Sequence, residues 1–258
     1  MTGGEAWIKD FVEEPRRSGI FLDFDGTLSE IAPTPEEARL HPRAAPILER
    51  LARRYPVCIM SGRKAAEVAA LAGTPRTHYV GGHGMEWLEE DIRTDPEVLA
   101  HLPALDEARE QIKPELESLE GVIMEDKLVT LALHYRLAPE QEESVLSLAD
   151  TVAITLGLEV RRGRKVVELR PHVDVDKGTV LIRLARGWRL KRALYAGDDR
   201  TDVEGFRGLR YLMREGGFDG VAIAVLSPET PVELEAVADV TVQGVDGLLD
   251  ILENLLQD

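Results

Sequence analysis

The sequence predicts an α/β fold in which a parallel sheet carries helices on both faces and is interrupted by an inserted α+β layer. Two observations lead to this prediction. Short apolar runs alternate with helical stretches at both ends of the 258-residue chain, which is typical of βαβ units with a parallel sheet. Between residues 102 and 170 the order changes to helix, two strands, helix, two strands. We therefore expect a core formed by 1–101 and 172–258 and an insertion at 102–171.

The predicted elements of the first half of the core alternate in type. They are a strand at Ile20–Leu22, a helix at Pro42–Arg54, a strand at Val57–Met60, a helix at Lys64–Leu71 stopped by Gly73, and a strand at His78–Gly81. The second half of the core continues the pattern. Its predicted elements are a helix at Lys177–Arg186 closed by Gly187, strands at Arg192–Ala196 and Val221–Val225, and a helix at Val245–Leu256.

The insertion is predicted to contain two helices and two hairpins. The helices span roughly Leu105–Leu119 and Pro139–Leu156, with Gly157 ending the second. The last hairpin pairs 159–161 with 165–170 around Gly163. We expect hinges at Asp95–Pro103 and Pro171–Asp176, where the insertion joins the core.

Composition excludes several classes of function. The 47 acidic and 31 basic residues give a net charge of −16, which repels nucleic acid and anionic membranes. The lone cysteine, Cys58, excludes an internal disulfide framework and is expected to be buried. No apolar stretch at the N-terminus has the length of a signal peptide or a membrane span. We expect a cytoplasmic monomer whose partner is a small molecule rather than nucleic acid or a membrane.

Two carboxylates stand one residue apart after the first predicted strand. Asp23 and Asp25 precede Gly26 in the run Leu22-Asp23-Phe24-Asp25-Gly26-Thr27. Alternate side chains of an extended chain share a face, so both can point into the crevice beyond the strand's carboxyl end, where open α/β sheets bind ligands. One carboxylate can attack a phosphoryl group while the other moves protons. Taken alone, the pattern also fits an acidic strand end before a turn.

Further polar segments follow other predicted strands or open helices. Ser61, Gly62 and Arg63 supply a hydroxyl, backbone amides and a guanidinium, all suited to phosphate oxygens. Lys177 is a candidate fixed cation at the start of a later helix. After the strand at 192–196 comes the acidic loop of Asp198, Asp199 and Asp202, and carboxylate oxygens are the ligands that Mg²⁺ prefers.

In this order, DxDGT, SGR, KG and GDDxTD resemble the four signature motifs of the haloacid dehalogenase-like (HAD) phosphohydrolases. The resemblance implies a Rossmann-like core with an inserted cap domain of type C2. It implies that Asp23 is the nucleophile, that Asp25 is the general acid and base, and that Ser61 and Lys177 hold the phosphoryl group. Mg²⁺ would bind Asp198, the Asp23 carboxylate and the Asp25 backbone carbonyl, with Asp199 and Asp202 in supporting positions.

The insertion carries a second set of polar residues. Strand alternation places Glu125 and Lys127 on one face of their strand. It also places His134 and Arg136 on one face of the next strand. If the two strands pair as a hairpin that turns near Leu128, the four residues form one polar surface. Glu168 faces the same way in the last hairpin. Groups of both charge signs suit the hydroxyls of a sugar, although a solvated outer face of the sheet would look similar.

Together with His83 and Glu86, which follow the third predicted strand, these residues resemble the trehalose-6-phosphate phosphatase family. The resemblance implies that Glu125, Lys127, Arg136 and Glu168 contact the disaccharide, with His134 a further candidate, and that His83 and Glu86 shape the core side of the pocket. It leads us to expect an Mg²⁺-dependent hydrolysis of trehalose 6-phosphate to trehalose and phosphate through an aspartyl-phosphate intermediate.

Two alternatives remain open from the sequence. The first is a related capped phosphatase that acts on another sugar or glyceryl-glycoside phosphate, such as sucrose 6-phosphate or mannosyl-3-phosphoglycerate. The second is a non-catalytic module that binds a sugar phosphate and regulates another protein. The presence of Asp23, Asp25, Lys177 and Asp198 together disfavours the second alternative. Zinc-like histidine spacings, nucleophile elbows and P-loop fingerprints are missing from the sequence.

Overall fold

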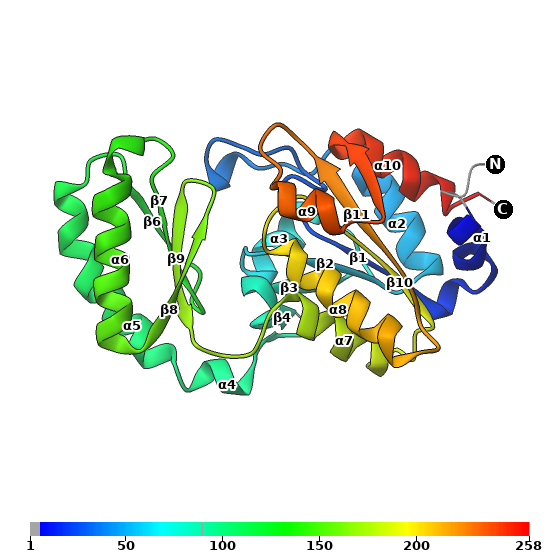
Figure 1. Ribbon diagram of the computed structural model, residues 1–258, viewed down its shortest axis with the longest axis horizontal. Coiled ribbons are helices and arrows are strands. Elements are labelled where there is room, and N and C mark those ends of the chain that lie inside the picture. Colours follow the sequence, from blue (N-terminus) through cyan, green and yellow to red (C-terminus); the bar gives the residue numbers. More distant parts are fainter. Residues whose placement is uncertain (1–5, 89, 258) are drawn as a thin grey trace. The chain divides into compact units, whose positions relative to one another are not determined.

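The computed structural model describes residues 6–88 and 90–257, which fall into two compact units (Figure 1). The first unit comprises Met1–Ile92 and Val175–Asp258, and the second comprises Arg93–Asp174. The second unit contains the insertion expected at 102–171 and extends beyond it at both ends. The first boundary precedes the hinge expected at Asp95–Pro103, and the second lies inside the hinge expected at Pro171–Asp176.

An eight-stranded sheet has the order β12-β11-β10-β1-β2-β3-β4-β5, and all of its strands except β5, which crosses the boundary after Ile92, lie wholly in the first unit. The strands are β1 (Ser18–Leu22), β2 (Val57–Met60), β3 (His78–Gly81), β4 (Glu86–Leu88), β5 (Ile92–Thr94), β10 (Arg192–Gly197), β11 (Asp219–Leu226) and β12 (Val240–Gln243). From β12 to β3 every neighbouring pair is parallel, and β4 returns antiparallel to β3. The carboxyl ends of six strands therefore lie at one edge of the sheet.

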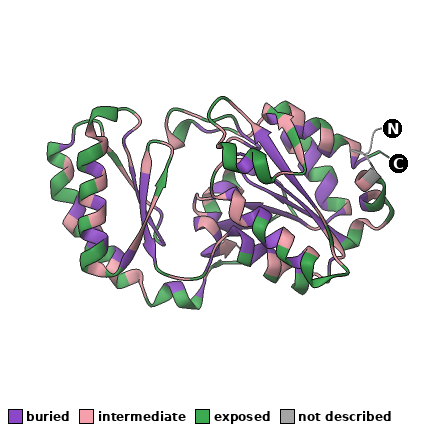
Figure 2. Cartoon of the chain, in the orientation of Figure 1, coloured by how far each residue is buried: buried purple, intermediate pink, exposed green. Residues whose placement is uncertain are grey.

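Helices cover both faces of this sheet, which confirms the predicted α/β fold. They are α1 (Ala6–Glu13), α2 (Ala44–Arg54), α3 (Ala65–Ala72), α7 (Lys177–Gly187), α8 (Asp202–Glu215), α9 (Val232–Val237) and α10 (Gly244–Asn254). Figure 1 shows α2 and α10 on one side of the sheet and α7 and α8 on the other. Alternation along β1 divides its side chains between these layers, because Ile20 and Leu22 pack with α2 and α10, whereas Phe21 stacks on Trp188 at the end of α7. Figure 2 shows the central strands buried along most of their length.

The second unit contains a four-stranded antiparallel sheet with the order β6-β7-β9-β8. Its strands are β6 (Ile123–Asp126), β7 (Leu131–His134), β8 (Leu158–Gly163) and β9 (Val166–Pro171), and its helices are α4 (Pro96–Leu99), α5 (Leu102–Glu115) and α6 (Glu142–Leu156). Residues of α5 and α6 form a separate apolar core with Leu131, Leu133, Val167 and Leu169 of the sheet. The predicted order of helix, two strands, helix, two strands is thus present.

Gly187 does not end α7 in the way that the sequence predicts. It is the last helical residue, and the left-handed position belongs to Arg189, with φ of 55°. The Leu190 N–H donates to the Ala185 carbonyl at 2.9 Å and the Arg189 N–H donates to the Arg186 carbonyl at 3.1 Å. This is the Schellman arrangement, and it shows that the turn is fixed by backbone hydrogen bonds rather than by a glycine.

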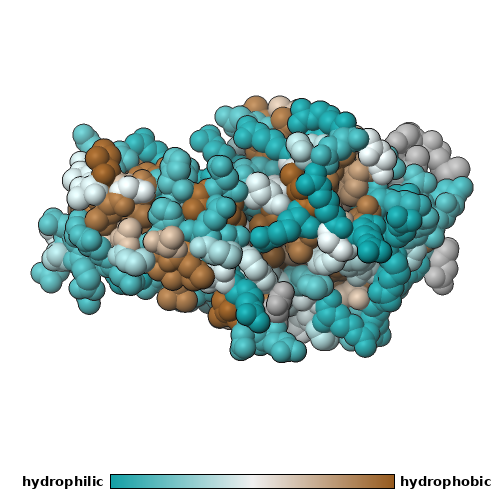
Figure 3. Space-filling view, turned by 90° about the horizontal axis from the view of Figure 1, so that it is seen from below, coloured by the Kyte–Doolittle hydropathy of each residue, from teal (hydrophilic) through white to brown (hydrophobic). Residues whose placement is uncertain are grey.

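In the view of Figure 3, hydrophilic side chains cover much of the visible surface and hydrophobic ones form smaller patches. This agrees with a chain in which 30% of the residues are charged. Among the described residues, none of the helices combines the length and the apolar character that crossing a membrane requires.

Candidate active site

Three adjacent strands deliver polar residues to the same edge of the sheet. Asp23 directly follows β1, and its N–H continues the ladder by donating to the Ala196 carbonyl of β10 at 2.9 Å. Asp198 directly follows β10, and Ser61 directly follows β2 on the other side of β1. The parallel register therefore brings segments 23–25, 61–63 and 197–202 together beyond the carboxyl ends of the strands, as expected for a ligand site in such a sheet.

Gly26 allows the loop after β1 to approach Asp198. Its φ of 82° lies in the left-handed region that glycine adopts without strain. A Cβ atom at this position would stand only 2.2 Å from Oδ2 of Asp198. A side chain here would thus displace either the loop or the carboxylate.

Lys177 is buried between two carboxylates. Its Nζ lies 2.6 Å from Oδ1 of Asp23 and 2.7 Å from Oδ1 of Asp202, and only 1% of the residue is exposed. Burial acts to lower the pKa of Lys177, but Asp202 and Asp23 outweigh it and raise that pKa well above its ordinary value. The side chain is therefore a fixed positive charge next to Asp23, placed there by the capping box with which Asp176 starts α7.

Asp202 organises the acidic loop. Its Oδ1 accepts hydrogen bonds from Lys177 and from the Tyr195 hydroxyl at 2.8 Å, and its Oδ2 accepts from the backbone N–H groups of Asp198 and Asp199, both at 3.0 Å. With four donors around a fully buried carboxylate, Asp202 fixes both the lysine and the loop. Tyr195 was not among the residues singled out in the sequence. A tyrosine inside an apolar strand gives no signal that distinguishes it from a core residue.

The acidic cluster has the composition of a divalent-cation site. Oxygen atoms of Asp23, Asp198 and Asp202 all lie within 4.8 Å of one another. When ionised, the three carboxylates carry three negative charges, and the positive charge of Lys177 brings the net charge of the cluster to −2. Since both oxygens of Asp202 already accept two hydrogen bonds each, Asp23 and Asp198 are the better ligands. Hard carboxylate oxygens without sulfur or imidazole suit a cation such as Mg²⁺ or Ca²⁺.

Burial raises the pKa of Asp23 to about 8, although the Lys177 ammonium acts in the opposite direction. Neighbouring Asp202 and Asp25 add to the increase. A bound cation would offset the effects of burial and of the neighbouring carboxylates, because it stabilises the ionised form of Asp23. The buried position of Asp23 therefore favours a metal in the site.

Arg63 holds Asp25. Its Nε and Nη2 donate to the two oxygens of the Asp25 carboxylate at 2.8 and 2.9 Å, and its Nη1 donates to Glu67 at 2.5 Å. The sequence had suggested that this guanidinium binds phosphate. In the structure both of its edges contact carboxylates, while the backbone N–H of Arg63 donates to the Ser61 hydroxyl at 3.1 Å. The arrangement is bidentate, which fixes the direction of the Asp25 side chain.

His83 and Glu86 lie beside the loop that contains Ser61 and Gly62. His83 has a left-handed φ of 55°, and its ring packs so closely on Gly62 that a Cβ atom there would lie 2.5 Å from Nε2. Glu86 is 1% exposed, and its carboxylate accepts a hydrogen bond from the N–H of Ala65 at the start of α3. Burial raises the pKa of Glu86, whereas that hydrogen bond lowers it. This position makes Glu86 a support of the loop rather than an exposed binding group.

A polar cluster lies on the face of the second unit's sheet that is opposite its helices. The register aligns Glu125, Ala132 and Glu168 across three strands. Glu168 accepts hydrogen bonds from Lys127 at 3.1 Å and from the Thr130 hydroxyl at 2.8 Å. In the same cluster, His134 and Glu125 form a hydrogen bond of 2.8 Å.

The turn expected near Leu128 is present, since that residue has a φ of 70° between the paired strands β6 and β7. Arg136 lies beyond the end of β7 and donates to the Arg164 carbonyl at 3.4 Å. The structure thus groups Glu125, Lys127, His134 and Glu168 directly. It adds Thr130, whose position in a short turn gave no sequence signal.

Comparisons with known proteins identify the family of the chain. The family model for trehalose-phosphatase matches residues 21–233. The trehalose-phosphate phosphatase of Mycobacterium marinum is 36% identical over 217 residues, which cover 81% of this chain and 54% of that protein. The chain thus spans about half the length of this curated relative.

Solved structures show the same fold. The C-terminal domain of Candida albicans trehalose-6-phosphate phosphatase superposes with a TM-score of 0.82 at 20% identity, covering 98% of this chain and 97% of that one. A haloacid dehalogenase-like hydrolase from Bacteroides thetaiotaomicron superposes with a TM-score of 0.63 at 16% identity, covering 92% and 98%. The matched range and the identity to the curated relative from Mycobacterium marinum lead to one conclusion: the chain belongs to the trehalose-phosphatase family.

Proposed function

We propose that the protein is an Mg²⁺-dependent phosphatase that hydrolyses trehalose 6-phosphate to trehalose and inorganic phosphate. The observation that carries the proposal is the buried contact of Asp23 with Lys177, within 4.8 Å of the Asp198 and Asp202 carboxylates. A carboxylate can attack a phosphate dianion only where fixed positive charge offsets their repulsion. Membership of the trehalose-phosphatase family supports the choice of substrate.

In the proposed reaction an oxygen of Asp23 attacks phosphorus and the bond from phosphorus to the sugar oxygen breaks. Asp25 donates a proton to the departing sugar oxygen. Water then attacks the aspartyl phosphate, and Asp25 takes a proton from that water, which releases phosphate and restores Asp23. Lys177, the Ser61 hydroxyl and the backbone around Gly62 hold the phosphoryl oxygens.

Asp23, Asp198 and the Asp25 backbone carbonyl are the proposed ligands of Mg²⁺. When bound, the ion supplies positive charge that lowers the electrostatic cost of bringing the carboxylate to the phosphate. Asp202 and Asp199 are proposed to act indirectly: Asp202 orients Lys177 and accepts hydrogen bonds from the backbone N–H groups of Asp198 and Asp199, which fix the loop. Arg63 is proposed to orient Asp25 rather than to bind phosphate.

The polar cluster of the second unit is the proposed sugar-binding surface. Glu125, Lys127, His134 and Glu168 offer donors and acceptors of both charge signs, and Arg136 adds a further donor. Sugar hydroxyls need both kinds of partner. We further propose that the protein works as a cytoplasmic monomer on this small-molecule substrate, and that it binds neither nucleic acid nor membranes.

A substrate panel tests the proposal. Purified protein with Mg²⁺ is assayed for phosphate release from trehalose 6-phosphate, sucrose 6-phosphate, glucose 6-phosphate and mannosyl-3-phosphoglycerate. We expect kcat/KM to be highest for trehalose 6-phosphate, and an absence of this preference would refute the substrate. Asp23→Asn should abolish turnover without loss of the fold, judged by circular dichroism. Retained hydrolysis would remove Asp23 from the mechanism.

A further inference from the structure

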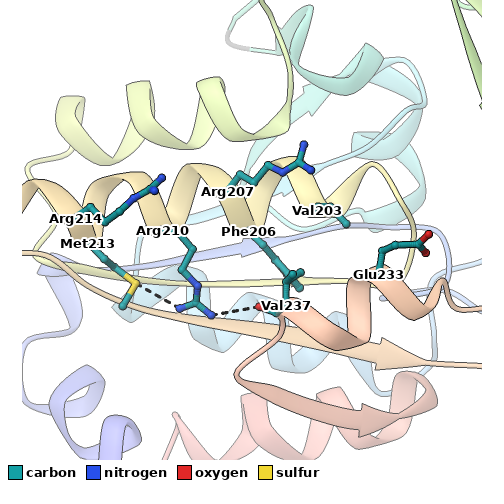
Figure 4. Close-up of a pocket in the computed structure, with 8 residues that line it drawn as sticks. All are labelled: Val203, Phe206, Arg207, Arg210, Met213, Arg214, Glu233 and Val237. Carbon is teal, nitrogen blue, oxygen red and sulfur yellow. Dashed lines mark hydrogen bonds between the residues drawn. The ribbon is translucent and has the colours of Figure 1, made fainter.

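A groove lies between α8 and α9 in the first unit, on a part of α8 that the proposed reaction does not use. Its volume is about 740 Å³, which is within the range of small-molecule sites. The lining residues, drawn in Figure 4, are Val203, Phe206, Arg207, Arg210, Met213, Arg214, Glu233 and Val237.

The floor of the groove is apolar. Phe206 is 1% exposed and fixed in the core, Val203 and Met213 are half-buried, and Val237 of α9 is 44% exposed. In Figure 4 the side chains of Phe206 and Met213 extend from α8 toward the side where Val237 lies. An occupant therefore needs an apolar body to cover this floor.

The positive charge of Arg210 in the groove is already neutralised by Asp239. Arg210 donates to Asp239 at 2.6 Å and to the Val237 carbonyl at 3.3 Å, and it contacts the sulfur of Met213 at 3.6 Å. These contacts tie α8 to the end of α9. Glu233, the acidic residue of the lining, lies 3.8 Å from Arg200. Neither Arg210 nor Glu233 leaves an uncompensated charge in the groove.

Arg207 and Arg214 differ from Arg210. Both are exposed, and within residues 6–88 and 90–257 neither makes an ion pair or a side-chain hydrogen bond. They stand seven residues apart on α8, about 10 Å along the helix, and Figure 4 shows both side chains above α8 in that view, whereas Phe206 and Met213 extend below it. In a chain with a net charge of −16, two guanidinium groups without acidic partners beside one apolar groove form a local positive site.

We propose that this groove binds a small ligand with an apolar body and one or two anionic groups, such as an aromatic or aliphatic carboxylate, sulfonate or phosphate monoester. The floor takes the apolar body, and Arg207 and Arg214 take the anion through charge-assisted hydrogen bonds. The net charge of −16 repels highly acidic polymers and anionic membranes far more strongly than a small anion, which favours a small ligand. The inference does not depend on the proposed phosphatase activity.

The test uses 8-anilinonaphthalene-1-sulfonate, which joins an aromatic body to one sulfonate and fluoresces when bound. We expect the wild-type protein to bind one probe per chain, with decanoate as a competitor. The double variant Arg207→Gln, Arg214→Gln should bind at least tenfold more weakly, the order expected when charge-assisted contacts are lost. Val237→Glu should weaken binding as well, because it places a carboxylate at the apolar floor.

The matched control is Arg53→Gln, Arg162→Gln, which removes the same charge from two exposed arginines that pair with Glu49 and Asp150. The control should bind within twofold of the wild type. Equal affinity of the groove variant and the control would overturn the inference, as would displacement of the probe by Mg²⁺ with inorganic phosphate. Sedimentation velocity supplies a third outcome: a wild-type dimer that the groove variant abolishes would make this surface an interface between copies and would overturn a small-ligand site.

Discussion

The pairing of Arg63 with both oxygens of Asp25 is the reason we propose that this arginine orients Asp25, although the sequence suggested that it binds phosphate. Arg63 is buried, and its guanidinium lies between Asp25 and Glu67. An arginine that binds the phosphoryl group would contribute to the hydrolysis of any phosphate ester. An arginine that orients a general acid matters most when the leaving group needs a proton.

Arg63→Ala should therefore separate substrates by leaving group. We expect kcat/KM, which reports the steps up to departure of the leaving group, to fall about 100-fold with trehalose 6-phosphate, whose alkoxide leaving group requires general acid catalysis. With p-nitrophenyl phosphate, whose leaving group is stable as an anion, kcat/KM should fall only a few-fold. Steady-state kinetics with both substrates measures the ratio.

Glu67→Gln serves as the control for Arg63→Ala, because it removes the other partner of the arginine and leaves the contact with Asp25. Its ratio of the two kcat/KM values should match that of the wild type. Equal losses for both substrates in Arg63→Ala would instead return Arg63 to phosphate binding.

The raised pKa of Asp23 predicts how metal binding depends on pH. In the metal-free protein this carboxyl has a pKa of about 8 because it is buried, so near pH 7 it carries a proton that Mg²⁺ must displace. Calorimetry in buffers of different ionisation enthalpy should find that Mg²⁺ binding releases protons near pH 7 and that this release decreases as the pH rises above about 8. Proton release that stays constant over this range would contradict the assignment of Asp23 as a ligand.

The same shift has a consequence for stability. Since the folded state holds the Asp23 proton more tightly than the unfolded state, with a pKa of about 8 against 3.8, the associated stabilisation is complete below pH 3.8. It is lost as the pH rises through 8. Asp23→Asn should therefore increase the thermal stability of the metal-free protein more at pH 9 than at pH 6. The change in the midpoint of thermal unfolding measures this effect.

At the scale of secondary-structure elements, the loop between β1 and α2 depends on Gly26. Gly26→Ala combines an unfavourable left-handed φ with a clash against Asp198. We expect at least tenfold weaker Mg²⁺ binding, measured by calorimetry, because the carboxylate must move. Gly73→Ala is the matched control: its φ of 60° is also left-handed, but no atom lies within 4 Å of the added Cβ.

The control should lose roughly 1 kcal/mol of stability from backbone strain and keep its affinity for the ion. If both variants bind Mg²⁺ as tightly as the wild type does, the close approach of Gly26 to Asp198 has no functional importance.

Strong local patterns made much of the fold predictable. Buried strands such as β1 and β2 are continuous apolar runs, and the polar residues that follow them must meet at one edge once the sheet is parallel. The short strands β4, β5 and β12 were not predicted, because three or four partly exposed residues are too few to give a clear pattern.

Side-chain pairings were less accessible than strand positions. Arg63 contacts Asp25, which lies in a different loop. Tyr195 of β10 contacts Asp202, which begins α8. Residue type and spacing indicate that such groups are near one another, but rotamers decide which partner each one takes. The motifs were sufficient to predict that segments 23–25, 61–63 and 197–202 meet at this edge, whereas the partners of Arg63 required coordinates.

For the whole molecule, the second unit has its own apolar core, formed by α5, α6 and one face of its sheet. A separate core predicts independent folding. Residues 93–174 expressed alone should unfold in one cooperative transition in urea, followed by circular dichroism. A gradual, non-cooperative loss of signal would show that this unit needs the rest of the chain.

The contact between Asp23 and Lys177 can form only late in synthesis, after both residues have been added to the chain. The two residues are 154 positions apart, and a ribosome adding about 5–20 residues per second needs roughly 8–30 s to cover that distance. Throughout this interval β1 lacks its neighbour β10, and Asp23 has no lysine beside it. The nascent chain must keep one side of a central apolar strand uncovered while the insertion emerges, which makes this period the one in which the polypeptide most needs protection from aggregation.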